Sequence, residues 1–294
     1  MRFPDFLCIG AQKAGTTWLH ENLRAQPEIW LPALKELHFL DHKPPSLRKR
    51  LFGRTSFHRL ARENLQIALA QWRRSEAPWS EVSAAFHVAY RARDFEWYEA
   101  IFPSDPTKVC GEICPGYARL PSSAIAEVVR RNPKIKIIYL LRDPIDRAWS
   151  SVAMHFRKGA DDQIDKHADS EVVQRLKSPK SFPHCTYAAN IGHWLEHLPR
   201  AQMYFGFFER IEQAPRQYLA EILGFLGVAS DVASNEADVR VNSGRGERIN
   251  ADVETELARL LADEARWLHA TFANVYTERW LDHANTALAR GVRT

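Results

Sequence analysis

Short apolar runs alternate with helical patterns along the chain. Three runs have the length and apolar content of buried strands: Phe3 to Ile9, Ile135 to Leu141 and Met203 to Phe208. Apolar residues recur with helical spacing from Thr16 onward, and again after the third run up to Gly227. Because strands that alternate with helices form parallel sheets, the pattern predicts an α/β fold with a mainly parallel central sheet flanked by helices.

The second apolar run is expected to be a central strand, because it is rich in β-branched residues and is not interrupted by polar positions. Ser122 and Ser123 can cap a helix before this run, and Asn132 with Pro133 would end that helix. A further helix is expected after the run, and its apolar face would consist of Ile145, Ala148, Trp149 and Val152.

Two segments depart from this alternation. Residues 41–59 are basic and interrupted by prolines, and residues 157–183 are polar and charged. We interpret both as excursions from the sheet, which either face an acceptor as lids or form solvated surface. Since no linker rich in glycine or serine divides the chain, we expect a single domain over residues 1–294.

The composition is typical of a soluble globular protein. Hydrophobic residues make up 45% and charged residues 26% of the 294 residues, which excludes a largely disordered or membrane-embedded chain. The formal net charge of +4 suits a small anionic ligand and gives little support for nucleic-acid binding. No signal peptide and no apolar run of about 18 residues is evident. We therefore expect a cytoplasmic protein without an integral membrane segment, whose four cysteines are reduced.

The segment Gly10-Ala-Gln-Lys13-Ala-Gly15-Thr16-Thr17 follows a predicted strand and opens a predicted helix. In that context the exposed N–H groups and the helix dipole bind anions. Gly10 and Gly15 have the spacing of a Walker A loop, but Thr16 stands where its lysine belongs, and the lysine lies earlier, at Lys13. The segment therefore predicts a phosphate-binding loop of another kind. The alternative is a plain turn in which the two threonines cap the helix.

Metal binding is not expected. Cys110 and Cys114 lie four residues apart, but no second cysteine pair completes a zinc site. The pairs His38/His42 and His193/His197 have helical i,i+4 spacing, but neither shows a third ligand, and the second does not match the H-E-x-x-H pattern.

Two motifs resemble the nucleotide site of sulfotransferases that use 3′-phosphoadenosine 5′-phosphosulfate (PAPS). The segment QKAGTTWL at residues 12–19 resembles the 5′-phosphosulfate loop of this family, and LLRDPIDRAWSS at residues 140–151 resembles its 3′-phosphate signature. The resemblance implies the P-loop-containing sulfotransferase fold and PAPS as the sulfate donor, without a required metal. It also implies these cofactor-binding residues: Lys13, Ala14, Gly15, Thr16, Thr17, Trp18, Arg142 and Ser150.

A third motif, KELHFLD at residues 35–41, resembles a segment of the heparan-sulfate and related carbohydrate sulfotransferases. In that branch the glutamate is assigned as the catalytic base, which points to Glu36. A carboxylate beside the transferable group can remove the acceptor proton as the nucleophile meets sulfur. His38 is the alternative base, because other members of the superfamily use a histidine. Lys13 would stabilise the charge on the leaving oxygen.

Two further segments match the family more loosely. Residues 111–117 (GEICPGY) are similar to an E-K-[ST]-P-x-Y stretch, but Ile113 replaces its lysine and Cys114 its serine or threonine. Glu112 and Tyr117 are therefore candidate substrate-binding residues, or a strand end and a core aromatic. Residues 242–248 occupy the place of the family's glycine-rich and basic loop, which makes Arg245 and Arg248 further candidates for binding the 3′-phosphate.

These motifs predict transfer of a sulfuryl group from PAPS to a hydroxyl or amine. The expected acceptor is a carbohydrate, a lipid or a small metabolite, and nucleic acid is not an expected partner. Two alternatives remain open at this point. One is a P-loop nucleotide kinase or NTPase, and the other is a non-catalytic protein that binds the product nucleotide, 3′-phosphoadenosine 5′-phosphate (PAP).

Overall fold

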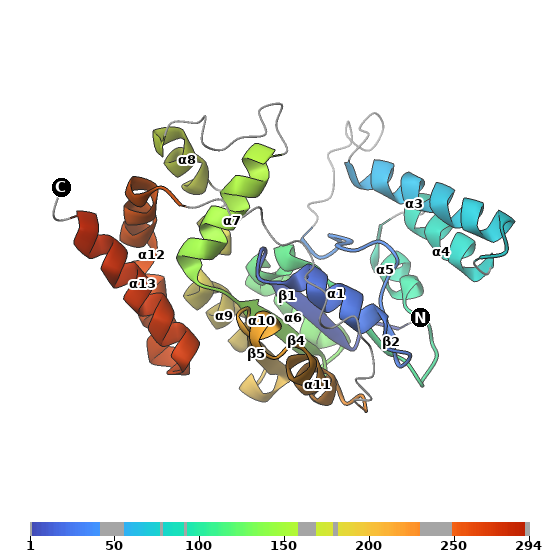
Figure 1. Cartoon of the computed structure of the whole chain (residues 1–294). Helices are drawn as coiled ribbons and strands as arrows, with labels where there is room; N and C mark the ends of the chain where they lie inside the picture. Colours follow the sequence, from blue (N-terminus) through green and yellow to red (C-terminus); the bar gives the residue numbers. More distant parts are fainter. Residues whose placement is uncertain are drawn as a thin grey trace.

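A five-stranded parallel sheet forms the centre of the computed structural model (Figure 1). The structure describes residues 2–41, 56–76, 79–90, 93–157, 169–178, 182–229 and 249–291. The strand order is β2-β3-β1-β4-β5, and all four pairings are parallel. The strands are β1 (Phe6–Gly10), β2 (Ile29–Trp30), β3 (Val109–Ile113), β4 (Lys136–Leu141) and β5 (Met203–Phe207). The predicted α/β architecture with a mainly parallel sheet is confirmed.

All three predicted strands are present, but the middle strand is β1, and β4 lies between β1 and β5. The apolar pattern did not predict β2 or β3, although the alternative interpretation of Glu112 as a strand end agrees with its place in β3. Strand β2 has only two residues, which is too short to produce a pattern. Strand β3 contains Gly111 and Glu112, and a charged residue within a buried strand conflicts with the apolar pattern that marks such strands.

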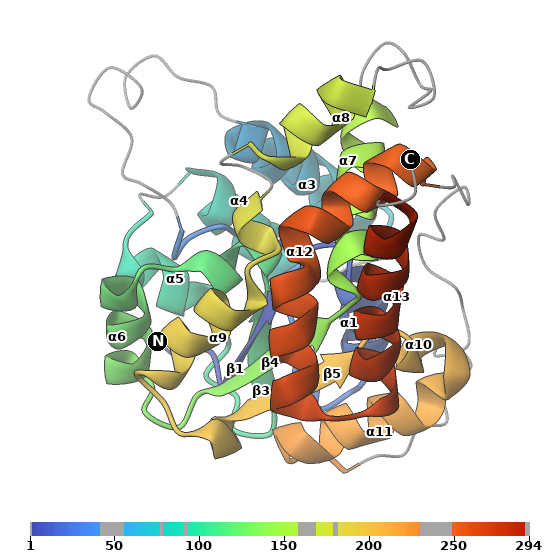
Figure 2. The same cartoon turned by 90° about the vertical axis from the view of Figure 1, so that its left-hand side faces the viewer.

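Helices cover both faces of the sheet, with α1, α10 and α11 on one side and α6 and α9 on the other (Figure 2). The pair α3 and α4 and the pair α12 and α13 stand at opposite ends of the molecule. The helices are α1 (Thr16–Arg24), α3 (Ser56–Arg73), α4 (Trp79–Tyr90), α5 (Phe95–Ile101), α6 (Ser122–Arg131), α7 (Pro144–Arg157), α8 (Asp169–Leu176), α9 (Tyr187–Leu195), α10 (Arg210–Gln213), α11 (Pro215–Leu226), α12 (Ala251–Phe272) and α13 (Val275–Gly291).

The predicted helix ends, including the end of α6 at Asn132, are confirmed except at the start of α6. Gly227 ends α11 with a φ of 84°, a conformation that glycine adopts at little cost. Helix α6 begins at Ser122, so the predicted serine cap is wrong: Pro121 precedes the helix, and no side-chain cap is present at this described end. The Ser122 hydroxyl instead lies 2.6 Å from Nε2 of His197.

The segments interpreted as excursions contain helices. Helix α3 begins within the first segment, and α8 lies within the second. Residues 42–55, 158–168 and 179–181 of these segments lie outside the described residues. The lid interpretation is therefore not addressed by the structure.

The core consists of two apolar clusters. The larger surrounds the sheet, and the smaller joins α7 and α8 to α12 and α13. The predicted apolar face of α7 lies in the smaller cluster, with Ile145 and Ala148 almost fully buried. All four cysteines are buried and free, as predicted. None of the helices within the described ranges combines the length and apolar character needed to cross a bilayer.

Candidate functional site

The loop after β1 and the residue after β4 meet at one edge of the sheet, because the two strands are parallel and end side by side. The Ala11 N–H donates to the carbonyl of Leu140 over 2.7 Å, which joins the start of the loop to β4. Gly15 has a φ of 86°, and a Cβ there would lie 2.1 Å from Cδ1 of Ile211. Glycine adopts this φ at little cost and leaves room for the Ile211 side chain, so it suits the sharp turn into α1.

The N-terminus of α1 is available for an anion. The first turn of a helix carries N–H groups without intrahelical partners, and it attracts negative charge. No side chain of the described residues caps α1, so the threonines do not serve as a helix cap. The Thr16 side chain is buried, whereas Thr17 and Lys13 are partly exposed.

Arg142 connects the two nucleotide motifs. Its Nη1 donates to the carbonyl of Lys13 over 3.0 Å, and its guanidinium lies 4.5 Å from the centre of the Phe208 ring. Helix α7 reaches the same loop, since Nζ of Lys13 lies 3.8 Å from Sδ of Met154. Ser150 lies on α7 and is partly exposed. The structure thus brings residues 10–17 and 142–154 together from separate parts of the chain.

Not every predicted cofactor residue presents its side chain. Ala14 is fully buried, and Trp18 is buried in a stack with Tyr218, with ring centres 5.7 Å apart. These two positions can offer only backbone groups to a ligand. Arg245 and Arg248 lie outside the described residues.

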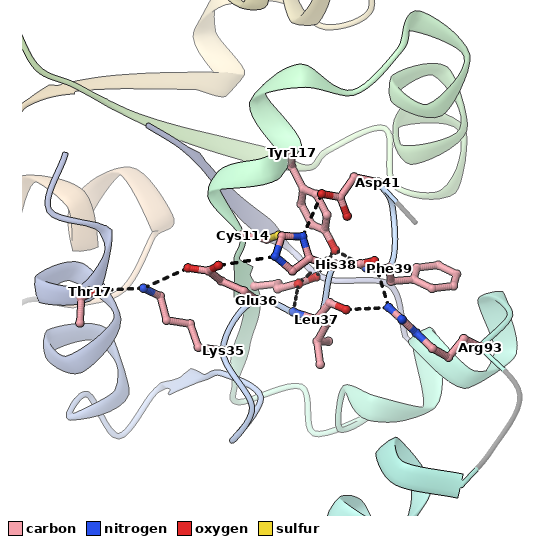
Figure 3. Close-up of polar contacts among 11 residues, drawn as sticks. Thr17, Lys35, Glu36, Leu37, His38, Phe39, Asp41, Arg93, Cys114 and Tyr117 are labelled. Atoms are coloured by element: carbon pink, nitrogen blue, oxygen red, sulfur yellow. Dashed lines mark hydrogen bonds and ion pairs between the residues drawn. The ribbon is translucent and has the colours of Figure 1, made fainter. Parts of the chain in front are cut away.

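Lys35 links the third motif to the predicted phosphate-binding loop at residues 10–17, hereafter the phosphate loop (Figure 3). Its Nζ donates to Oγ1 of Thr17 over 3.0 Å and lies 3.5 Å from a carboxylate oxygen of Glu36. Glu36 is therefore close to the N-terminus of α1. Its side chain is 37% exposed, which leaves the carboxylate open to an incoming molecule.

His38 lies between two carboxylates. Its Nδ1 is 2.9 Å from Oδ2 of Asp41, and its Nε2 is 3.6 Å from Oε2 of Glu36 (Figure 3). Sγ of Cys114 is 3.5 Å from the same Nδ1. The hydrogen bonds to Asp41, Cys114 and Glu36, in that order of importance, raise the pKa of His38 far above its usual value.

The pKa of Glu36 moves in the opposite direction. Burial alone would raise it, but the hydrogen bond with His38 and the positive charge of Lys35 together outweigh burial and lower the pKa. The pair at neutral pH is therefore an ionised carboxylate beside an imidazolium.

Lys13, Glu36 and His38 share an unusual backbone conformation. Their φ angles are 72°, 60° and 52°, in the left-handed region that costs an L-residue about 1–2 kcal/mol. Only two other described non-glycine residues have positive φ, Ser75 and Ala273. Such conformations cluster at functional sites, where the surrounding structure holds them. Three of the five described non-glycine residues with positive φ are thus residues that the motifs also single out.

Glu112 and Tyr117 do not occupy substrate-binding positions, and the alternative interpretation of a strand end and a core aromatic is confirmed. They are 1% and 0% exposed, respectively, so neither can touch an acceptor in this structure. Glu112 lies in β3, and Tyr117 lies in the 3-10 turn Pro115–Arg119 that follows it. Their hydroxyl and carboxylate groups hydrogen-bond to each other and to the loop at residues 37–40.

The sequence patterns did not single out Lys35, Asp41 or Arg93. Lys35 and Asp41 lie within the KELHFLD motif, and their charges beside Glu36 and His38 could have marked them as site residues. Arg93 donates to the carbonyls of Leu37 and His38 over 2.6 and 3.0 Å. No local pattern marks Arg93, because its partners lie more than 50 positions away.

Within the described part of the chain, two clusters each place three potential metal ligands within 4.8 Å of one another. In each cluster a histidine already pairs with an aspartate, at 2.9 Å in the first and 2.8 Å in the second. These ion pairs account for the close approach of two of the three side chains in each cluster. The clusters consist of His38, Asp41 and Cys114, and of Asp143, Asp146 and His283.

Comparison with known proteins gives a consistent result. The family model described as "Sulfotransferase domain" matches residues 3–258. The chain is 26% identical over 251 residues to the human bifunctional heparan sulfate N-deacetylase/N-sulfotransferase 3, which covers 80% of this chain and 24% of that protein. It is 27% identical over 169 residues to the human heparan sulfate glucosamine 3-O-sulfotransferase 3B1, covering 55% of this chain and 43% of that protein. The match thus spans about a quarter of the first relative and less than half of the second.

A solved structure has the same fold. The crystal structure of a sulfotransferase from Alicyclobacillus acidocaldarius superimposes with a TM-score of 0.65 and 21% identity, covering 95% of this chain and 99% of that one. The arrangement of strands and helices around the phosphate loop therefore has a precedent over almost the whole chain.

Proposed function

Because this chain belongs to the sulfotransferase domain family, we propose that it transfers a sulfuryl group from PAPS to a hydroxyl or amine acceptor, with Glu36 as the base. One observation carries the proposal. Two side-chain contacts, from Arg142 to the Lys13 carbonyl and from Lys35 to Thr17, join three separate motifs at the N-terminus of α1. That is the arrangement which an anionic donor and a proton acceptor both require.

The residues present fit the donor. Its phosphosulfate group would lie at the N–H groups of Gly15, Thr16 and Thr17, where the uncapped helix end favours negative charge. Arg142 carries a planar fork that suits a phosphate group, and Ser150 would add a hydroxyl from α7. Lys13 supplies a positive charge in the turn itself.

The chain's own groups then divide the chemistry. Glu36 accepts the proton of the acceptor as sulfur is attacked, and its lowered pKa keeps it ionised for this task. His38 is held protonated by Asp41, so it is poorly suited as the base. This favours Glu36 over His38. Lys13 stabilises the negative charge that develops on the oxygen leaving with PAP.

The acceptor is proposed from the relatives. Both curated relatives carry heparan sulfate in their names, so we propose a carbohydrate hydroxyl or amine first, and a lipid or small metabolite second. The test is incubation of the protein with labelled PAPS and panels of these acceptors, followed by mass analysis of the products. Transfer of a sulfuryl group supports the proposal. Tight binding of PAP without transfer to any acceptor, or binding of Mg²⁺–ATP in preference to PAP, contradicts it.

Arg142→Ala is expected to weaken PAP binding by about 10- to 100-fold, because a buried charge-assisted contact is worth about 1.5–3 kcal/mol. The measurement is calorimetric titration with PAP. Arg200→Ala is the matched control: its guanidinium lies 4.4 Å from the Phe205 ring and donates to the Met203 carbonyl over 2.7 Å. The control should bind PAP normally. Equal losses in the two variants would show that Arg142 acts through packing alone.

A further inference from the structure

A buried carboxylate lies directly beneath the loop that carries Glu36 and His38. Glu112 is 1% exposed, and it accepts three hydrogen bonds from neutral donors. The Leu37 N–H donates over 2.9 Å, the Tyr98 hydroxyl over 2.5 Å, and the Tyr117 hydroxyl over 3.1 Å. Burial of a carboxylate without such partners would raise the free energy of the folded state. The three hydrogen bonds therefore compensate for the burial of Glu112 in β3.

Tyr117 extends this contact along the loop. Its hydroxyl donates to Glu112 and accepts from the N–H groups of Phe39 and Leu40, over 3.0 and 3.3 Å. The N–H groups of residues 37, 39 and 40 therefore all donate to the side chains of Glu112 and Tyr117. Arg93 holds the carbonyl side of the same segment, and the Phe39 ring stacks on Tyr98 with ring centres 4.6 Å apart.

The donor count specifies the chemistry of position 112. Each partner of Glu112 offers a hydrogen, so only a group that accepts at both oxygens satisfies all three. A glutamine would point an NH₂ group at one of these donors. That mismatch would rotate the hydroxyl hydrogen of Tyr98 or Tyr117 away from position 112. Rotation at Tyr117 would disturb its hydrogen bonds with the loop.

We propose that Glu112 is a positioning residue, which acts with Tyr117 to fix the backbone of residues 37–40 and thereby holds Glu36 and His38 in the orientation needed for proton transfer. The proposal rests on the proposed function for its catalytic consequence. The loop needs such support, because Glu36 and His38 flank Leu37 with φ angles of 60° and 52°. These are unfavourable for L-residues and persist only where neighbours impose them.

The ionisation of Glu112 gives the proposal a pH signature. Burial raises the pKa of Glu112 to about 7, against the hydrogen bonds from Tyr98, Tyr117 and Leu37 and the charge of His38. The other charged or titratable groups that interact with it are Arg93 and Cys114. Protonation as the pH falls through about 7 removes an acceptor, so the rate should fall there. Glu36 titrates lower, because its own pKa is lowered.

The test compares Glu112→Gln and Tyr117→Phe with the wild-type chain. Each variant should lower kcat about 10-fold, with the affinity for PAP unchanged, because a hydrogen-bonded group is left without its partner. Glu112→Gln should also lose the fall in rate near pH 7. Tyr204→Phe is the matched control. The Tyr204 hydroxyl also donates to a glutamate, Glu221, over 3.4 Å, but Tyr204 lies on β5 and does not contact the loop at residues 37–40 in any described hydrogen bond. The kcat of this control should stay at the wild-type value.

Amide hydrogen exchange provides a readout that needs no turnover. Exchange at Leu37, Phe39 and Leu40 should be about 10-fold faster in both variants and unchanged in Tyr204→Phe. Unchanged exchange in Glu112→Gln and Tyr117→Phe would overturn the positioning role. Absence of sulfuryl transfer by the wild-type chain, with exchange changed as expected, would overturn the proposed function instead. A loss of PAP affinity equal to the loss of kcat would also count against positioning.

Discussion

Glu36→Gln is expected to lower kcat by about 100-fold or more, while the affinity for PAP stays at its wild-type value. The amide keeps the shape of the side chain but cannot take up the acceptor proton. Lys35 still bonds to Thr17 in this variant, so the phosphate loop keeps its support. Steady-state kinetics with a fixed acceptor give kcat, and calorimetric titration gives the affinity for PAP.

Two comparisons make this result specific. Glu127→Gln removes a carboxylate that pairs with Arg130 and Arg131 on α6, and it should leave kcat unchanged. His38→Gln removes the imidazolium whose hydrogen bond lowers the pKa of Glu36. That variant should keep activity at high pH and lose it at a higher pH than the wild type. Loss of activity at every pH in His38→Gln, with near-normal turnover in Glu36→Gln, would assign the base to His38.

Lys13→Ala is expected to lower kcat by about 10²- to 10³-fold, the range found when a preorganised group that stabilises a developing charge is removed. Lys13 lies in the turn before α1, beside Arg142, where the leaving oxygen of the donor is proposed to lie. The ammonium and the helix N-terminus act on the same charge. Rapid mixing with PAPS and acceptor would measure the chemical step directly.

The control for this variant removes a lysine elsewhere. Lys136→Ala deletes a positive charge near the Phe225 ring, at the opposite end of β4 from Arg142, and should leave the chemical step unchanged. Lys13→Arg should recover part of the lost rate, because it restores the charge but not its position. Turnover of Lys13→Ala within a few-fold of the wild type would mean that the helix end and Arg142 carry the charge alone.

Local sequence patterns predicted the α/β architecture, three of the five strands and four of the described helices, because these elements follow simple rules. Strand β4 is apolar at nearly every position, and α11 ends at Gly227. Strand β3 escaped detection because Glu112 breaks its apolar run. The burial of Glu112 is compensated by hydrogen bonds from Leu37, 75 positions away, and from Tyr98, 14 positions away. Compensation of this kind depends on tertiary contacts that no window of the sequence contains.

In the candidate site, too, local motifs could be predicted from the sequence, whereas long-range contacts could not. The phosphate loop and the KELHFLD motif were recognisable because their residues are consecutive. The contacts that join these motifs are not, since Lys35 meets Thr17 and Arg142 meets the Lys13 carbonyl across 18 and 129 positions. Glu112 and Tyr117 were noticed from their motif, and their burial decides between the two alternatives in favour of a strand end and a core aromatic.

The left-handed backbone at Lys13, Glu36 and His38 also affects how the stability of this protein could be improved by engineering. Glycine or asparagine adopts such angles more cheaply than lysine, glutamate or histidine does. Selection of variants for heat resistance alone would therefore favour replacement of these three residues, and the proposed roles of Lys13 and Glu36 imply that the resulting stable proteins would lose activity. A campaign that screens for turnover in parallel should instead find its gains in the surface helices, where stability and activity are not in competition.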